Sequence, residues 1–145
     1  MTRTAGFSLI ELVVVLLLVA VLLAIAVPGY VHTVEGVHRT MAKLTLMEIA
    51  ARQERYLQNH KRYGLSLAQL GFGEQLLIDA TATATDESRA IYQIALAVEE
   101  GEYRGVRAVP LNGQKRDLDC GVLTLHRNGE RQVSGRLQAN PELCW

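Results

Sequence analysis

Apolar residues are concentrated at the amino-terminal end of the chain. Every position from Leu12 to Val27 is apolar, and the run ends at Pro28. A helix from Phe7 to Val27 would be about 31 Å long, at roughly 1.5 Å per residue. Because a bilayer core is about 30 Å thick, this segment is long enough to cross a membrane. Glu11 is unusual here, because an acid near the centre of such a helix costs about 2.5–3.5 kcal/mol of insertion free energy.

A second, amphipathic pattern follows Pro28 and Gly29. Proline removes a backbone hydrogen bond, so we expect a kink at these two residues rather than a helix end. Helical spacing resumes beyond them, first at Val31, Val34, Val37 and Met41, and then in a mostly apolar stripe at Leu46, Ile49, Ala50, Gln53 and Leu57. The pattern predicts one long helix from Phe7 to near Leu57, whose second half lies against a sheet.

The remainder of the chain shows strand and turn signals. Leu65–Gly73 is typical of a short helical turn ended by glycines, and Ala80–Ser88 of an exposed loop. Strands are predicted around Tyr92–Val98, Tyr103–Val109 with a bulge near Gly105, Gly121–His126, and Arg131–Ser134. Asn128-Gly129 is a hairpin signal between the last two strands. The fold class is therefore α+β, with a long amino-terminal helix packed on an antiparallel sheet of about four strands.

Composition narrows the function classes. The 145 residues have zero formal net charge, so the whole chain offers no electrostatic argument for nucleic acid, although a local basic patch stays open. Basic residues and tyrosines do alternate near the end of the long helix, at Arg52, Arg55, Tyr56, Lys61, Arg62 and Tyr63. This run fits a nucleic-acid patch, but a solvated helix end explains it as well and is the favoured interpretation.

The two cysteines, Cys120 and Cys144, both lie in the last quarter of the chain. Downstream of a membrane or export segment, such a pair indicates a disulfide, with two free buried thiols as the alternative. A bridge would stabilise the domain by roughly 3–4 kcal/mol in the loop-entropy model.

Catalytic and metal-binding patterns are missing from the sequence. The histidines do not stand at ligand spacing with the cysteines, and no phosphate-binding glycine loop, nucleophile elbow or paired histidines appear. Asp117 and Asp119 could form a metal site or an acid pair, but turn caps and ion-pair partners are the commoner roles of such acids. We therefore predict a protein that is not an enzyme and holds no cofactor or metal.

The first residues indicate membrane orientation. Arg3 precedes the apolar run, so this end is expected to stay cytoplasmic while the remainder is exported. Two plain interpretations are an amino-terminal anchor and a secretory signal, since Ala24–Ala26 offers a small-residue cleavage site before Val27.

The string Gly6-Phe7-Ser8-Leu9-Ile10-Glu11, followed by the apolar run and Pro28, resembles the prepilin segment of type IV pilins and of the pseudopilins of type II secretion systems. The resemblance implies the type IV pilin fold. It also implies cleavage by prepilin peptidase between Gly6 and Phe7 and methylation of the new terminus at Phe7. The expected organisation is a leader over 1–6, a transmembrane and assembly helix over 7–30, and a globular domain over 31–145.

Glu11 is expected to set the register of assembly in such a filament. A carboxylate among apolar helices needs a partner, and the amino group of Phe7 on an adjacent subunit would supply one. The partners implied by the resemblance are other pilins, the prepilin peptidase and methylase, and the inner-membrane assembly platform. The subunit would stand in the inner membrane with a periplasmic domain, and after assembly in the cell-surface pilus.

Further motifs resemble PilE-like minor pilins, a subgroup that includes DNA receptors of transformation. They are Glu54-Arg55-Tyr56, Leu70-Gly71-Phe72, the stretch from Pro110 to Gly121, and the ending Cys144-Trp145. The first interpretation is a minor pilin that supports pilus assembly or initiation, adhesion or twitching motility. The alternatives are a DNA-binding minor pilin for natural transformation and a type II secretion pseudopilin, the latter weakened by the lack of an evident calcium site. Candidate DNA contacts are Lys115, Arg116, Arg127, Arg131 and Arg136.

Overall fold

The computed structural model describes residues 8–145. The chain divides into two compact units, residues 1–34 and residues 35–145. Helix α1, Leu9–His60, contributes residues to both. The predicted start of this helix at Phe7 lies outside the described residues, and its end falls slightly beyond the predicted end near Leu57.

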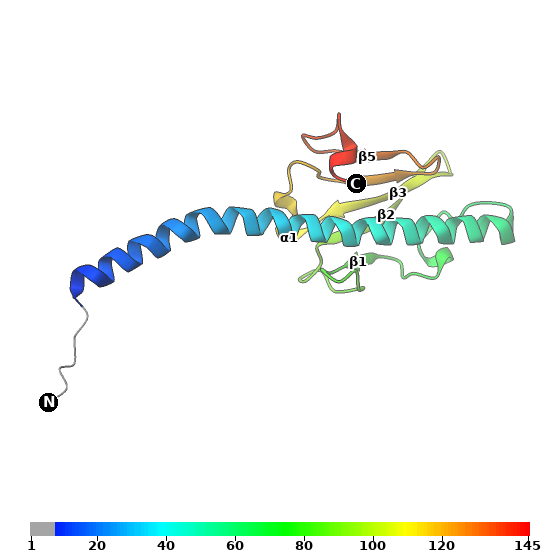
Figure 1. Cartoon of the computed structure of the whole chain (residues 1–145). Helices are drawn as coiled ribbons and strands as arrows, with labels where there is room; N and C mark the ends of the chain where they lie inside the picture. Colours follow the sequence, from blue (N-terminus) through cyan, green and yellow to red (C-terminus); the bar gives the residue numbers. More distant parts are fainter. Residues whose placement is uncertain (1–7) are drawn as a thin grey trace. The chain divides into compact units, whose positions relative to one another are not determined.

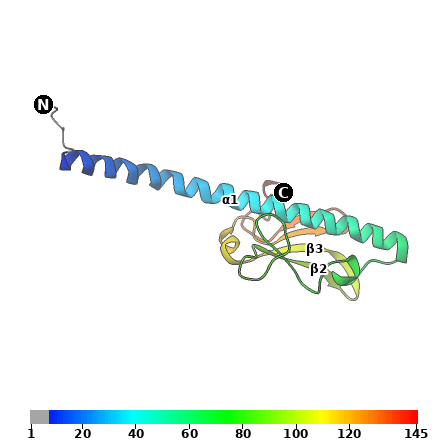
Figure 2. The same ribbon diagram turned by 90° about the horizontal axis from the view of Figure 1, so that it is seen from below.

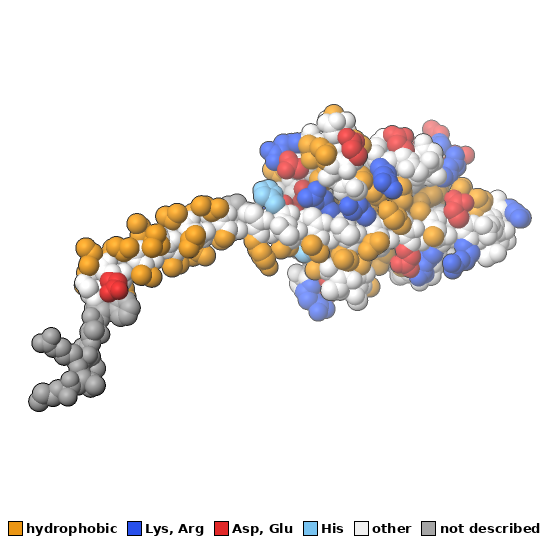
Figure 3. Space-filling model, viewed as in Figure 1, with side chains coloured by type: hydrophobic (Ala, Val, Ile, Leu, Met, Phe, Trp, Pro, Cys, Tyr) orange, Lys and Arg blue, Asp and Glu red, His pale blue; other side chains and the backbone are white. Residues whose placement is uncertain are grey.

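In the first unit, the apolar side chains of α1 from Leu9 to Val27 are exposed. Figure 3 shows hydrophobic side chains over this part of the helix. Helix α1 is long and apolar enough to cross a membrane. A signal sequence near an amino terminus can have the same length and composition. The helix continues through Pro28 and Gly29 without interruption, which confirms that it does not end at the proline. The kink itself stays a prediction.

The second unit contains a five-stranded antiparallel sheet in the order β1-β2-β3-β4-β5. The strands are β1 Leu76–Ile78, β2 Tyr92–Glu99, β3 Glu102–Pro110, β4 Leu123–His126 and β5 Arg131–Val133. Three short 3₁₀ helices accompany them: η1 Ala68–Leu70, η2 Asn112–Arg116 and η3 Pro141–Leu143. The predicted α+β pilin fold is thus confirmed.

Residues 35–60 of α1 run along one face of this sheet (Figures 1 and 2). Ala42, Leu46 and Ile49 are fully buried in the same cluster as Ile94 and Val106 of the sheet. Their spacing of three and four residues places them on one face of the helix, so the packing follows from the amphipathic pattern.

Gln53 is a polar member of the buried stripe, and its side chain holds the segment that follows α1. Its Nε2 donates to the Gly64 carbonyl at 2.8 Å, and its Oε1 accepts from the Gly64 amide at 2.8 Å. Both polar groups of the side chain are therefore satisfied in the core, as burial requires.

Strand β1 was not predicted from the sequence. Its three residues, Leu76–Ile78, are all buried, so they show no alternation of apolar and polar positions. A short apolar run of this kind does not distinguish a strand from other buried segments.

The predicted irregularity near Gly105 is present. Ala97 pairs with Gly105 and Val98 pairs with Tyr103, so Arg104 is the extra residue of a bulge. Gly105 is required for close approach, because a Cβ there would come within 2.5 Å of the Leu125 carbonyl oxygen on β4.

The β4–β5 connection is a hairpin, as Asn128-Gly129 predicted, but its loop has one residue more than the two-residue form. Leu125 pairs with Arg131, and the His126 amide donates to the Glu130 carbonyl at 2.9 Å. Gly129 adopts a φ of 85°, which is the left-handed position that a three-residue loop assigns to glycine.

Candidate nucleic-acid interface

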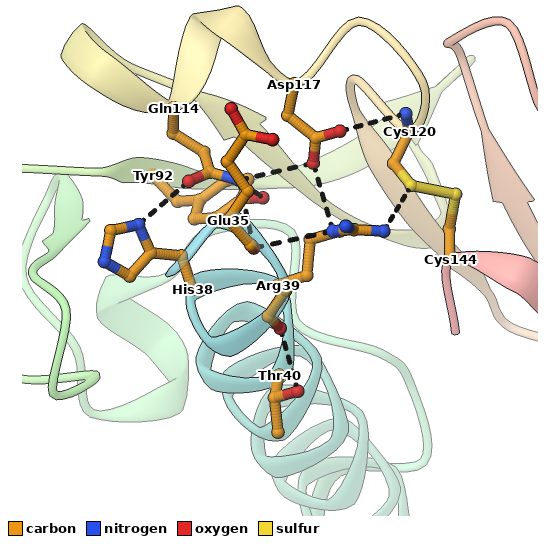
Figure 4. A network of polar contacts seen from close by, with 10 residues as sticks. Glu35, His38, Arg39, Thr40, Tyr92, Gln114, Asp117, Cys120 and Cys144 are labelled. Carbon is orange, nitrogen blue, oxygen red and sulfur yellow. Dashed lines mark hydrogen bonds and ion pairs between the residues drawn. A yellow bond between two sulfur atoms is a disulfide. The ribbon is translucent and has the colours of Figure 1, made fainter. Parts of the chain in front are cut away.

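A buried polar network holds η2 against α1 (Figure 4). The Gln114 amide nitrogen donates to Asp117 Oδ2 at 3.3 Å and lies 3.1 Å from the Tyr92 hydroxyl. Its amide oxygen therefore remains to accept from His38 Nδ1, 2.9 Å away on α1. Burial raises the pKa of the Tyr92 phenol well above its ordinary value, and the nearby Asp117 charge raises it further.

Asp117 and Arg39 form the ionic centre of the network. Arg39 Nε lies 3.2 Å from Asp117 Oδ2, and the Asp117 side chain is only 2% exposed. Asp117 Oδ1 also accepts from the Cys120 amide at 3.3 Å, and the Arg39 guanidinium contacts Cys120 Sγ at 2.8 Å. Asp119 pairs instead with Arg136 at 2.8 Å. Both aspartates thus act as ion-pair partners, the commoner of the two roles that the sequence suggested.

The Cys120–Cys144 disulfide predicted from the sequence is present, with a Cα–Cα distance of 5.7 Å. It holds the carboxyl end of the chain beside β5. There, Trp145 Nε1 donates to the Gln132 carbonyl at 3.3 Å, and the Arg131 guanidinium lies 5.5 Å from the centre of the Trp145 ring. The disulfide therefore holds the aromatic ring beside which the Arg131 guanidinium lies.

Basic side chains from α1 and β5 meet along one boundary. We call Arg39, Lys43 and Arg131 the basic seam. The pKa of Lys43 is lowered, chiefly by burial and then by repulsion from Arg39 and Arg131, so these three charges are close enough to interact. Figure 3 shows Lys and Arg side chains along the boundary between α1 and the β5 side of the sheet. Within residues 8–145, neither Lys43 nor Arg131 forms a salt bridge.

A second basic and aromatic group lies where α1 ends. Tyr63 stacks obliquely on Tyr103, with ring centres 5.3 Å apart, and the Arg127 guanidinium lies 5.7 Å from the Tyr63 ring centre. These residues, with Arg62 and Glu102, line a hollow of about 280 Å³, which we call the tyrosine hollow.

Two contacts fix the Tyr63 side of this hollow. The Tyr63 hydroxyl donates to Glu54 Oε1 on α1 at 3.0 Å, and the adjacent Gly64 is held by Gln53. Partial burial and the Glu54 carboxylate raise the pKa of the Tyr63 phenol.

The five candidate DNA contacts do not share one location. Arg131 belongs to the basic seam and Arg127 to the tyrosine hollow, while Arg136 is engaged with Asp119. Lys115 and Arg116 are exposed on η2. Their contact with DNA stays a prediction.

Sequence reasoning missed Lys43 and Trp145 as members of a site. Lys43 is one of several charged residues outside the buried stripe of the helix, and only the packing of β5 beside α1 adds Arg131 to its helical neighbour Arg39. Arg62 and Tyr63 did carry a signal, the alternation of basic and aromatic residues. The sequence did not show that Arg127 lies beside Tyr63, because the β4–β5 hairpin brings the two residues together.

The predicted processing residues Gly6 and Phe7 lie outside the described residues. Glu11 lies in the first turn of α1 and is exposed.

Comparison with known families decides the class. Residues 28–124 match the family model of the type IV minor pilin ComP, described as a DNA uptake sequence receptor. The chain belongs to this ComP family of type IV minor pilins. Residues 1–27 match the prokaryotic N-terminal methylation motif. A search of curated proteins found no matching relative.

Membership agrees with the fold and with the predicted absence of catalysis, because pilins are structural proteins rather than enzymes. The methylation motif implies processing by prepilin peptidase. An apolar amino-terminal helix with this motif is typical of inner-membrane prepilins that are assembled into pili. The ComP-family match covers Arg39 and Lys43 of the basic seam, whereas Arg131 lies beyond the matched residues.

Proposed function

We propose that this ComP-family pilin binds DNA at the cell surface during natural transformation. The observation that carries the proposal is the match of residues 28–124 to a family described as a DNA uptake sequence receptor. Of the three roles considered from the sequence, this match favours the DNA-binding minor pilin over pilus initiation, adhesion or twitching, and over a secretion pseudopilin.

The basic seam supplies the chemistry that DNA binding needs. Lys43 and Arg131 come from two different elements and repel each other, so a phosphate placed between them would relieve that repulsion. The Arg131 guanidinium is exposed and lies 5.5 Å from the centre of the Trp145 ring, so it is accessible to a phosphate. Contacts of this kind bind and position the DNA backbone without reading its sequence.

The amino-terminal segment would deliver this domain to the surface. Prepilin peptidase would cut between Gly6 and Phe7 and methylate Phe7, removing residues 1–6. Residues 7–30 would first anchor the subunit in the inner membrane and then enter the filament among other pilins, with residues 31–145 first periplasmic and then at the surface. Glu11 would pair with the Phe7 amino group of an adjacent subunit.

The test is DNA binding by the full chain in detergent, titrated with duplex DNA at several salt concentrations. We expect affinity to fall steeply with salt, because each phosphate contact releases counterions. The double variant Lys43→Ala, Arg131→Ala should bind more weakly and lower the steepness of the log–log salt dependence by about 2, roughly 1 per phosphate contact.

Arg89→Ala is the matched control, since Arg89 is exposed and already paired with Asp86 at 3.0 Å. It should bind like the unchanged protein. No binding at low salt would overturn the proposal.

In cells, the double variant should lose transformation while keeping pili. If it instead lost pili with normal DNA binding, the assembly role would replace ours.

A further inference from the structure

The tyrosine hollow differs in chemistry from the basic seam. The seam presents positive charge, whereas the hollow combines an aromatic pair, Tyr63 and Tyr103, with Arg62, Arg127 and the carboxylate of Glu102. Glu102 is also paired with Arg104 at 3.2 Å. A site for phosphate alone would not place a carboxylate beside its arginines, because the carboxylate would repel the ligand.

An aromatic face bordered by hydrogen-bond donors and an acceptor suits a nucleobase. Bases stack on tyrosine through their π faces, and their edges offer donors and acceptors that arginine and glutamate can pair with. Tyr63 is well placed for stacking because its hydroxyl is tied to Glu54 and its ring is backed by Tyr103.

The face of Tyr63 toward Arg127 is not tightly closed. The guanidinium carbon lies 5.7 Å from the ring centre, beyond the 3.5–4.0 Å or so of optimal carbon contacts. By comparison, Arg52 lies 4.2 Å from the centre of the Phe72 ring. Arg127 is exposed, so it can move aside while a base takes its place on the ring, and it can then pair with the edge of that base.

We propose that the tyrosine hollow binds an unpaired nucleobase of a DNA strand, stacked on Tyr63 and bordered by Arg127 and Glu102. Bases within a duplex have their faces covered by their neighbours, so an unpaired end or a splayed base is the form that can enter. This proposal rests on the proposed DNA binding and extends it: the pilin would favour DNA that carries a single-stranded end.

Three DNA probes test it with the full chain in detergent: a blunt duplex, the same duplex with a short oligothymidine tail, and the same duplex with an abasic tail of equal length. The abasic tail carries the same phosphates without bases. We expect the thymidine tail to bind more tightly than the abasic tail, by about 5- to 150-fold for one stacked base.

Tyr63→Leu should abolish this base-dependent advantage while binding of the blunt duplex is unchanged. Tyr63→Phe keeps the ring, loses the contact with Glu54, and should retain most of the advantage. Thermal unfolding of both variants shows whether the domain remains folded. If Tyr63→Leu fails to fold, Arg127→Ala on the exposed hairpin replaces it, and should reduce the advantage in the same way.

Equal binding of the thymidine and abasic tails would overturn this inference, as would an advantage that survives Tyr63→Leu. In both cases, binding of the blunt duplex would leave the proposed function standing. Absence of binding to all three probes would overturn the proposed function itself.

Discussion

At the scale of single residues, Asp117 links helix α1 to the backbone at Cys120. Its carboxylate is almost fully buried, pairs with Arg39, and also accepts from the Cys120 amide. Removing one partner of a buried ion pair leaves the other charge uncompensated, which makes such pairs costly to break.

We therefore expect Asp117→Ala to lower the free energy of unfolding by about 3–5 kcal/mol. Urea unfolding of the full chain in detergent, followed by the circular dichroism of the sheet, measures this. Asp119→Ala is the matched control. This change removes an ion pair in which the Asp119 side chain is 43% exposed and the Arg136 side chain 72% exposed. It should lower the free energy of unfolding by less than about 1 kcal/mol. Equal effects of the two changes would contradict the structural role given to Asp117.

Tyr103 makes the domain sensitive to high pH. Burial is the main cause that raises its pKa to about 12 from an ordinary value near 10. Because the folded state holds this proton more tightly than the unfolded state, the contribution to stability is complete below about pH 10. It is then lost as pH rises toward 12.

The expected result is a free energy of unfolding that is constant up to about pH 10 and falls above it. Tyr103→Phe should make this fall shallower, since the buried group can no longer ionise. Urea unfolding at pH 9 and pH 11 gives the comparison. The same pH dependence in both proteins would exclude Tyr103 as a cause.

At the scale of elements, the β3–β4 pairing depends on a glycine. A side chain at Gly105 would meet the Leu125 carbonyl of β4, whereas a Cβ at Gly113 in η2 meets nothing within 4 Å. The sheet can keep its register only if one strand carries no side chain at this point.

Gly105→Ala should therefore lower the free energy of unfolding by about 1–3 kcal/mol, the usual cost of overpacking. Gly113→Ala should change it far less. Thermal unfolding of both variants measures the difference. A Gly105→Ala protein as stable as the unchanged one would mean that β3 and β4 separate more easily than their pairing indicates.

At the scale of the whole molecule, the disulfide fixes the carboxyl end of the chain against the sheet. Cys144 is adjacent to Trp145, and this tryptophan contacts Gln132 and Arg131 of β5. The bridge thus stabilises the domain and also holds one side of the basic seam.

Reduction of the Cys120–Cys144 bridge should lower the thermal midpoint, with a loss of roughly 3–4 kcal/mol in the loop-entropy model. Trp145 is the single tryptophan of the chain, so its fluorescence reports the released end directly. We expect an emission shift toward longer wavelength as the ring becomes hydrated. An unchanged midpoint and an unchanged spectrum under reductant would contradict this role of the disulfide.

The sequence determined the features that depend on local pattern. The run from Phe7 to Val27 predicted the apolar helix segment, the three- and four-residue spacing predicted its amphipathic continuation, and Asn128-Gly129 predicted the hairpin. These signals are carried by neighbouring residues, so no knowledge of distant packing is needed to interpret them. The oxidising compartment expected beyond a membrane segment was enough to predict the disulfide.

Only the tertiary structure decided where the functional side chains meet. Lys43 and Arg131 are far apart in the chain, as are Tyr63 and Arg127, and each pair is joined because the β4–β5 hairpin folds back beside α1. Such contacts depend on the register of the sheet and its packing on the helix, which a one-dimensional pattern does not specify. The short buried strand β1 was missed for a related reason, since its burial is set by elements distant in the sequence.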